Sequence, residues 1–176
     1  MPDVRTLRGI ELIKVGRWDA KTGVMRTTAQ DLVSAIEAFN AGVVHRPALK
    51  LGHVEPLGEG DPAMGVISNM RLSADGQTLL GDFVGVPAKL AAIMPYAYPH
   101  RSIEAVYDFQ DQHGREWPMV ILAVALLGAM EPAVTGLKSL ADVEELYAAR
   151  ARRDCAVLVA AARRRRTQRT LTQPKG

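Results

Sequence analysis

The sequence predicts an α+β body of about six strands and about two or three helices, followed by a basic tail. A chain of 176 residues with 48% hydrophobic and 23% charged residues suits one soluble domain with a substantial core. Several short segments alternate apolar and polar residues, as strands do, and one segment has clear helical spacing. Residues 150–176 hold eight arginines and one lysine against one acid, Asp154, so the basic character belongs to the tail.

Six segments have the composition of strands. They are residues 7–18, 48–53, 64–72, 78–86, 100–109 and 117–128. The first alternates around a glycine break and is followed by the turn DAKTG. The third and fourth flank SADGQ, which is a hairpin signal. The last, WPMVILAVALLG, is apolar on both faces, as expected for a central strand.

Three segments have helical character. Residues 27–42 form the clearest helix, with Thr28 as the expected N-cap and Asp31 in a capping-box position. Residues 87–97 begin with proline, which is favoured in the first turn. Residues 139–166 are rich in alanine and then in arginine, so we expect a basic helix that frays into disorder toward the C-terminus.

Composition excludes several classes of protein. The single cysteine, Cys155, excludes an internal disulfide and a multi-cysteine zinc site, and fits a reducing compartment. Residues 1–9 are polar and charged, so no signal peptide is expected. The longest apolar run, residues 119–130, is too short to span a bilayer. The aspartates have no metal-site spacing. We therefore expect a soluble intracellular protein, or one that acts inside a particle assembled in a cell.

Ser102 and His53 are the candidate reactive residues. His53 follows a strand that ends at glycine, so it is either an ordinary turn residue or a reactive side chain presented from a rigid scaffold. Ser102 and Glu104 share one face of their strand because strand side chains alternate with a period of two. A serine hydroxyl needs a nearby base to become a nucleophile. The pattern leaves two interpretations open: Ser102 is a nucleophile, or a polar residue on the solvated face of a sheet. His45 and His113 are expected to be solvated loop residues.

Four motifs carry a family resemblance. In chain order they are LKLGH, GVISNMRL with DGQTLLGDFVGVP, RSIEAVY, and AVALLGAMEPAVTGL. This order, which runs from about Ile10 to Leu137, resembles the phage Mu-type capsid protease–scaffold family (Mu-like prophage protein I). That family is similar to the tailed-phage prohead proteases and, in fold, to the herpesvirus assembly protease. The resemblance implies a small, mostly antiparallel β-barrel-like core flanked by helices. It implies a protease-like domain over residues 1–137 and a basic, partly disordered helical tail over 138–176.

The resemblance also implies a function. The chain would be a serine endopeptidase of phage head maturation, located in the host cytoplasm inside the assembling procapsid. It would cut scaffold and itself without a cofactor or metal, with the scaffold and the major capsid protein as partners, and relatives suggest a homodimer. Ser102 would be the nucleophile and His53 the base. Glu104 is the favoured third residue, Glu131 is the other candidate, and a bare serine–histidine dyad is a further option.

Two rival functions come from other classes. One is a catalytically inactive assembly protein that keeps the fold to bind coat or scaffold subunits. The other is a nucleic-acid-binding module, because clustered arginines in the tail attract phosphate without sequence readout.

The chain also departs from the family in length, since relatives often continue into a long acidic scaffold segment.

Overall fold

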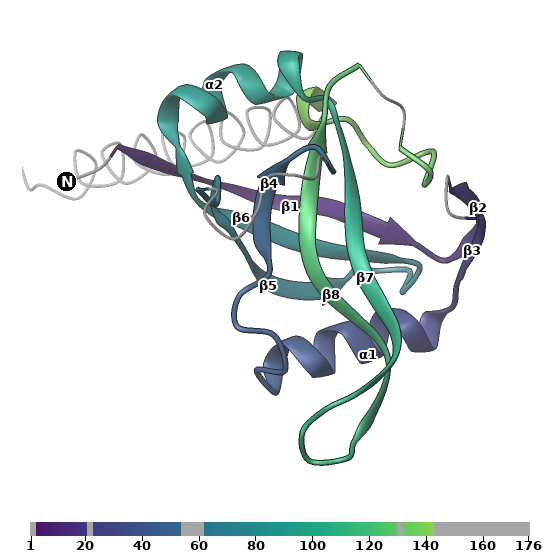
Figure 1. Cartoon of the computed structure of the whole chain (residues 1–176). Coiled ribbons are helices and arrows are strands. Elements are labelled where there is room, and N and C mark those ends of the chain that lie inside the picture. The colour runs from purple at the N-terminus through teal and green to yellow at the C-terminus, as the bar shows by residue number, and fades with distance from the viewer. Residues whose placement is uncertain (1–2, 21–22, 54–61, 130–131, 143–176) are drawn as a thin grey trace, which may run out of the picture. The chain divides into compact units, whose positions relative to one another are not determined.

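The computed structural model describes residues 3–20, 23–53, 62–129 and 132–142 of the chain (Figure 1). Its strands are β1 (Val4–Lys14), β2 (Gly16–Ala20), β3 (Gly23–Thr27), β4 (Ala48–Leu51), β5 (Val66–Leu72), β6 (Thr78–Pro87), β7 (His100–Gln110) and β8 (Glu116–Leu127). Its helices are α1 (Ala29–Asn40) and α2 (Ala88–Ala97). The predicted mixture of helices and strands is therefore confirmed.

Six of the strands form one mixed sheet in the order β1-β6-β5-β4-β8-β7, and β2 pairs with β3 in a separate hairpin. Within the described sheet, β4 and β8 are the parallel pair and the other neighbours are antiparallel. The expectation of a mostly antiparallel sheet is confirmed. The predicted SADGQ hairpin joins β5 to β6, and the apolar β8 has a neighbour on each side, as a central strand should.

The expected barrel-like core is not found: β1 and β7 are the two ends of the sheet, so the described strands form an open sheet. The sheet is nevertheless strongly twisted, and β7 and β8 run across the direction of β1 and β6 (Figure 1). A side chain bridges the two ends: Arg101 on β7 donates from Nε to the carbonyl oxygen of Glu11 on β1 at 2.6 Å. One long side chain thus connects strands that no backbone ladder joins.

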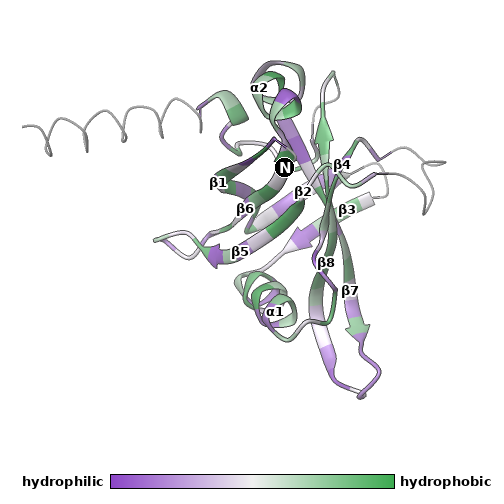
Figure 2. Cartoon of the chain, turned by 90° about the vertical axis from the view of Figure 1, so that its left-hand side faces the viewer, coloured by the Kyte–Doolittle hydropathy of each residue, from purple (hydrophilic) through white to green (hydrophobic). Residues whose placement is uncertain are grey.

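The two helices lie at opposite ends of the sheet (Figures 1 and 2). The predicted capping box of α1 is confirmed: the Thr28 hydroxyl accepts from the Asp31 N–H, and the Asp31 carboxylate accepts from the Thr28 N–H. The buried Ser34 hydroxyl donates to the carbonyl oxygen of Met119 at 3.0 Å and accepts from its N–H at 3.1 Å. These reciprocal bonds fix α1 against β8.

The core is built from side chains of the sheet and of both helices. Its largest fully buried apolar side chains are Ile10, Leu12, Ile13, Leu32, Leu49, Ile67, Leu79, Phe83, Met94, Met119 and Leu126. A Cβ at Gly81 would come within 2.9 Å of the Leu12 side chain and 3.0 Å of the Ile67 side chain, so a larger residue there would require these side chains to shift. By contrast, the turn that joins β7 to β8 is hydrophilic and lies far from α2 (Figure 2).

The N-terminal region differs from the sequence prediction. The single strand expected over residues 7–18 is two strands, β1 and β2, because the chain turns near Gly16 and the Trp18 ring packs over that glycine. Strand β3 was not predicted; it forms by pairing with β2. None of the described helices has the length and apolar character needed to cross a membrane. The predicted basic tail lies almost entirely outside the described residues and stays a prediction.

Candidate active site

Three neighbouring strands position the predicted site residues. In the ladder, Ser102 on β7 and Lys50 on β4 both lie opposite Ala125 of β8, which separates them. Two positions further along β7, Glu104 lies opposite Ala123 of the same strand. Residues in one row of a sheet share a face, and residues two apart on a strand share it too. Lys50, Ser102 and Glu104 therefore lie on one face, as the alternation predicted for the serine and the glutamate, with small alanines between them.

The structure brings His53 and Glu104 together. Nδ1 of His53 lies 2.8 Å from Oε1 of Glu104, although the residues are 51 positions apart. His53 follows β4, and the parallel pairing of β4 with β8 carries the end of β4 to the part of the sheet where β7 begins. The contact is partly solvated, with side-chain exposures of 42% for His53 and 29% for Glu104. A carboxylate on Nδ1 orients the imidazole and leaves Nε2 for another partner.

Lys50 is the site residue that the sequence analysis did not single out. Its ammonium lies 2.8 Å from Oε1 and 3.0 Å from Oε2 of Glu104. Glu104 thus binds a histidine and a lysine through the same carboxylate. The available signal was the alternation in ALKLGH, which places Lys50 and Ala48 on the face opposite the buried Leu49.

These contacts determine the ionisation of Glu104. Partial burial acts to raise the pKa of this carboxyl, but hydrogen bonds from Lys50 and His53, together with their charge, outweigh it. The pKa of Glu104 therefore lies below its ordinary value of 4.5. Glu104 is an anion at neutral pH and can hold a proton on Nδ1 of His53.

Ser102 is close to this pair in the fold but is not bonded to it. Its hydroxyl donates to the carbonyl oxygen of Ile103 at 3.5 Å, the long limit for such a bond. Between Ser102 and His53, both described, there is no hydrogen bond. The structure therefore pairs His53 with Glu104 through Nδ1 and leaves Ser102 without a bond to His53.

A wide groove of about 1220 Å³ has all three predicted residues in its lining. The β2–β3 hairpin contributes one wall and β7 another. Its lining includes Arg17, Trp18, Asp19, Met25, Arg26, His53, Ser102, Ile103, Glu104, Leu127, Pro132, Val134 and Thr135. Ser102 and His53 thus line the same groove.

The remaining predicted residues take no part in this cluster. His45 and His113 are exposed, His45 before β4 and His113 in the β7–β8 turn, as expected for solvated loop residues. Glu131, the alternative third residue, lies outside the described residues. In the part of the chain that the structure describes, no group of three or more His, Cys, Asp or Glu side chains could hold a metal ion.

Comparison with known proteins adds no relative. No family model matches the chain, and neither a curated protein nor a solved structure matches it.

Proposed function

We propose that this chain is a serine endopeptidase with Ser102 as nucleophile, His53 as general base and Glu104 as the group that orients the base. The observation that carries the proposal is the 2.8 Å contact from Nδ1 of His53 to Glu104 in a groove that Ser102 also lines. Serine proteases need a base whose Nδ1 proton is held by an acceptor, so that Nε2 is free to take the proton of the serine.

The chemistry follows from these positions. The Ser102 hydroxyl turns from Ile103 toward His53, which costs little because the bond that it leaves is at the long limit. Nε2 of His53 takes the hydroxyl proton as the oxygen attacks the scissile carbonyl, and then returns it to the leaving amine. The peptide C–N bond breaks, and the acyl group stays on Ser102. His53 then takes a proton from water as the water attacks this acyl-enzyme, and returns the proton to the Ser102 oxygen. Glu104 stabilises the imidazolium at each stage.

Lys50 has a supporting part in this proposal. Its contacts with both oxygens of Glu104 keep the carboxyl ionised and limit its rotation. A fixed anion is a better orienting group than a mobile one because less order is lost during the reaction.

The biological setting rests on the resemblance of the four motifs. We propose that the substrate is the scaffold of a phage procapsid and the chain itself, inside the assembling particle in the host cytoplasm, with the major capsid protein as a further partner. In this proposal an open, twisted sheet, with Arg101 of β7 hydrogen-bonded to β1, carries the site in place of a closed barrel.

A second candidate is a catalytically inactive assembly protein. The observation that favours it is the missing hydrogen bond between Ser102 and His53. In addition, Lys50 contacts the same oxygen of Glu104, Oε1, that His53 contacts. In that case His53, Glu104 and Lys50 form a structural ion cluster, and the groove binds a coat or scaffold segment without cutting it.

A serine-specific fluorophosphonate separates the two candidates without a known substrate. The wild-type protein is expected to gain the mass of one reagent, and Ser102→Ala to gain none. Ser68→Ala is the matched control, because Ser68 is half-buried on β5 and outside the groove lining. Labelling of Ser68→Ala at the wild-type rate then assigns the reaction to Ser102.

Cleavage is tested on the chain fused at its C-terminus to a candidate scaffold segment, followed by intact mass. Loss of the segment in wild type and not in Ser102→Ala supports the endopeptidase. Folded protein that neither reacts with the fluorophosphonate nor cuts the fusion favours the inactive assembly protein. Equal cleavage of both forms at one bond rejects Ser102 as the nucleophile.

A further inference from the structure

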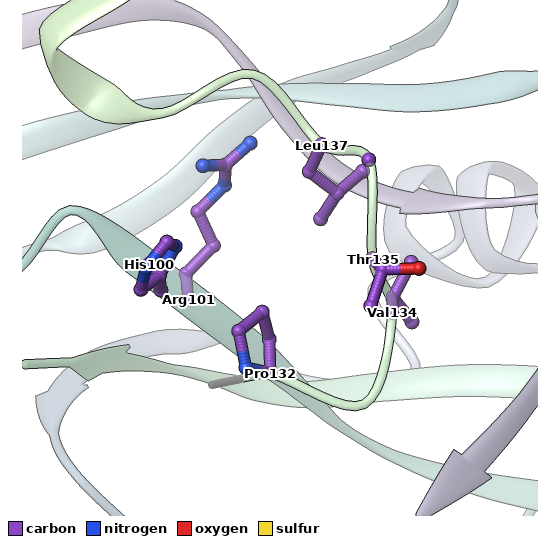
Figure 3. A pocket seen from close by; sticks show the side chains of 7 residues that line it. His100, Arg101, Pro132, Val134, Thr135 and Leu137 are labelled. Carbon is purple, nitrogen blue, oxygen red and sulfur yellow. The ribbon is translucent and has the colours of Figure 1, made fainter. Parts of the chain in front are cut away.

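A loop after β8 borders two hollow spaces. Residues 132–135, here called the wall loop, line the groove of Ser102. All of them except Ala133 also line a smaller cavity of about 210 Å³. In Figure 3 the chain curves around this cavity, with His100 and Arg101 of β7 across from it. The wall loop therefore lacks close packing where it borders each of the two spaces.

The wall loop is held mainly through the segment that follows it. Apolar packing holds it at Val134, which is buried, but among the described residues the wall loop forms no hydrogen bond. Directly after it, the carbonyl oxygen of Gly136 accepts from Nζ of Lys14 at 2.5 Å. The N–H of Lys138 donates to Oε2 of Glu11 at 2.9 Å. Both partners lie on β1, so β1 holds the C-terminal end of the wall loop.

Arg101 joins the same segment to the strand of Ser102. Its side chain is 1% exposed, and Nη1 donates to the carbonyl oxygen of Lys138 while Nε donates to that of Glu11, each at 2.6 Å. Nη2 has no hydrogen-bond partner within the described residues, so the guanidinium acts through these two bonds. Arg101 directly precedes Ser102, and consecutive strand side chains lie on opposite faces. Its influence on the groove therefore passes through the segment that it binds.

Glu11 is the residue at which these contacts meet. Its carbonyl oxygen accepts from Arg101, and its carboxylate accepts from the Lys138 N–H and pairs with Lys14 at 3.5 Å. The Glu11 side chain is 12% exposed, so its contacts are sheltered from most of the solvent and are stronger than at an open surface. One residue of β1 thus connects the strand that carries Ser102 with the segment that continues the wall loop.

We infer that Glu11, Lys14 and Arg101 are positioning residues for peptide binding, because they set the distance between the wall loop and the strand of Ser102. A loop that borders a cavity can yield toward it, so the width of the groove depends on the bonds that hold the end of the loop. A displacement of about 1 Å at a site can cost about 10²-fold in rate. The role in peptide binding rests on the proposed function, whereas the bonds to β1 do not.

Peptide affinity is measured on full-length Ser102→Ala protein, so that the probe is not consumed. The probe is the candidate scaffold segment of the fusion assay, made as a fluorescently labelled peptide. Glu11→Met removes the acceptor for the Lys138 N–H at nearly constant side-chain length, and Glu11→Gln is the matched control that keeps an oxygen there. We expect Glu11→Met to bind the peptide about tenfold more weakly than Glu11→Gln.

Lys14→Met tests the same contacts from a more exposed position, since the Lys14 side chain is 29% exposed. Its fold therefore does not depend on replacing a buried group. We expect weaker peptide binding than in Lys89→Met, which removes an exposed lysine of α2. Equal affinities within both pairs of variants would overturn the inference, and so would a failure of every form to bind the peptide.

Fluorophosphonate labelling separates a moved wall from a weakened fold. The reagent is smaller than a peptide and touches little of the groove, so with Ser102 intact Glu11→Met should be labelled at most about twofold more slowly than Glu11→Gln. A parallel fall in labelling and in peptide affinity would overturn the inference, because the contacts of Glu11 would then support the fold as a whole.

Failure of this inference and failure of the protease are distinguishable. Weaker peptide binding by Glu11→Met in a protein that never reacts with a fluorophosphonate keeps the positioning role and removes the catalysis. Reaction at Ser102 with equal peptide affinities in Glu11→Met and Glu11→Gln keeps the catalysis and removes the positioning role.

Discussion

Nδ1 of His53 and Oε1 of Glu104 lie 2.8 Å apart, at the edge of a groove that both residues line. The pair joins the end of β4 to β7 across the intervening strand β8. Its arrangement gives the imidazole one defined orientation, with Nδ1 as donor and Nε2 available. The consequences for catalysis and for stability can be measured separately.

Replacing the carboxylate of Glu104 should lower the reactivity of Ser102 more than the stability of the fold. Glu104→Gln keeps the size of the side chain but removes the anion that stabilises imidazolium, so the rate of fluorophosphonate labelling should fall about 10²- to 10⁴-fold. The measurement is intact mass against time, with Glu116→Gln as the control, because Glu116 is an exposed residue of β8. An unchanged labelling rate in Glu104→Gln would leave His53 without an orienting role.

Lys50→Met should have a small effect. The ion pair with Glu104 is partly exposed, with side-chain exposures of 36% and 29%, so its loss should cost no more than about 1 kcal/mol in the free energy of unfolding. Labelling of Ser102 should persist, since Glu104 still binds His53. Urea unfolding and labelling are compared with Lys89→Met, an exposed site on α2. Complete loss of labelling in Lys50→Met alone would point to the lysine as the base in place of His53.

The Glu104 cluster should make stability depend on pH in the acid range. The pKa of Glu104 is lowered in the folded state, so its contribution is fully present above the ordinary value of 4.5 and is lost as pH falls through the lower folded value. Thermal unfolding of wild type and Glu104→Gln should therefore give curves that are furthest apart near neutral pH and converge at low pH. A difference that stays constant down to pH of about 2 would contradict the lowered pKa.

The contact between α1 and β8 should depend on one hydroxyl. Ser34→Ala removes the acceptor for the buried Met119 N–H and the donor to its carbonyl oxygen, which should cost about 1–3 kcal/mol in the free energy of unfolding. Gln30→Ala, an exposed site on the same helix, should change stability much less. Chemical denaturation of both variants measures the difference. Equal stabilities would mean that water replaces the hydroxyl in the variant.

Local sequence predicted the features that depend on neighbours along the chain. The capping box of Thr28 and Asp31 needs only a spacing of three, and the β5–β6 hairpin needs only its turn residues. The shared face of Ser102 and Glu104 follows from the alternation of a strand. Strand β3 was missed because a short strand with little alternation is stabilised by its partner β2 and not by its own composition.

The sequence by itself determined the mixture of helices and strands, the caps and turns, and the choice of Ser102 and His53 as candidate reactive residues. The tertiary structure decided that Glu104 is the carboxylate on His53, that Lys50 shares it, and that Arg101 is buried with an unused donor. These three facts depend on the parallel pairing of β4 with β8 and on the approach of β7 to β1. Pairing between distant strands is selected by the burial of the whole core, so no short stretch of sequence carries it.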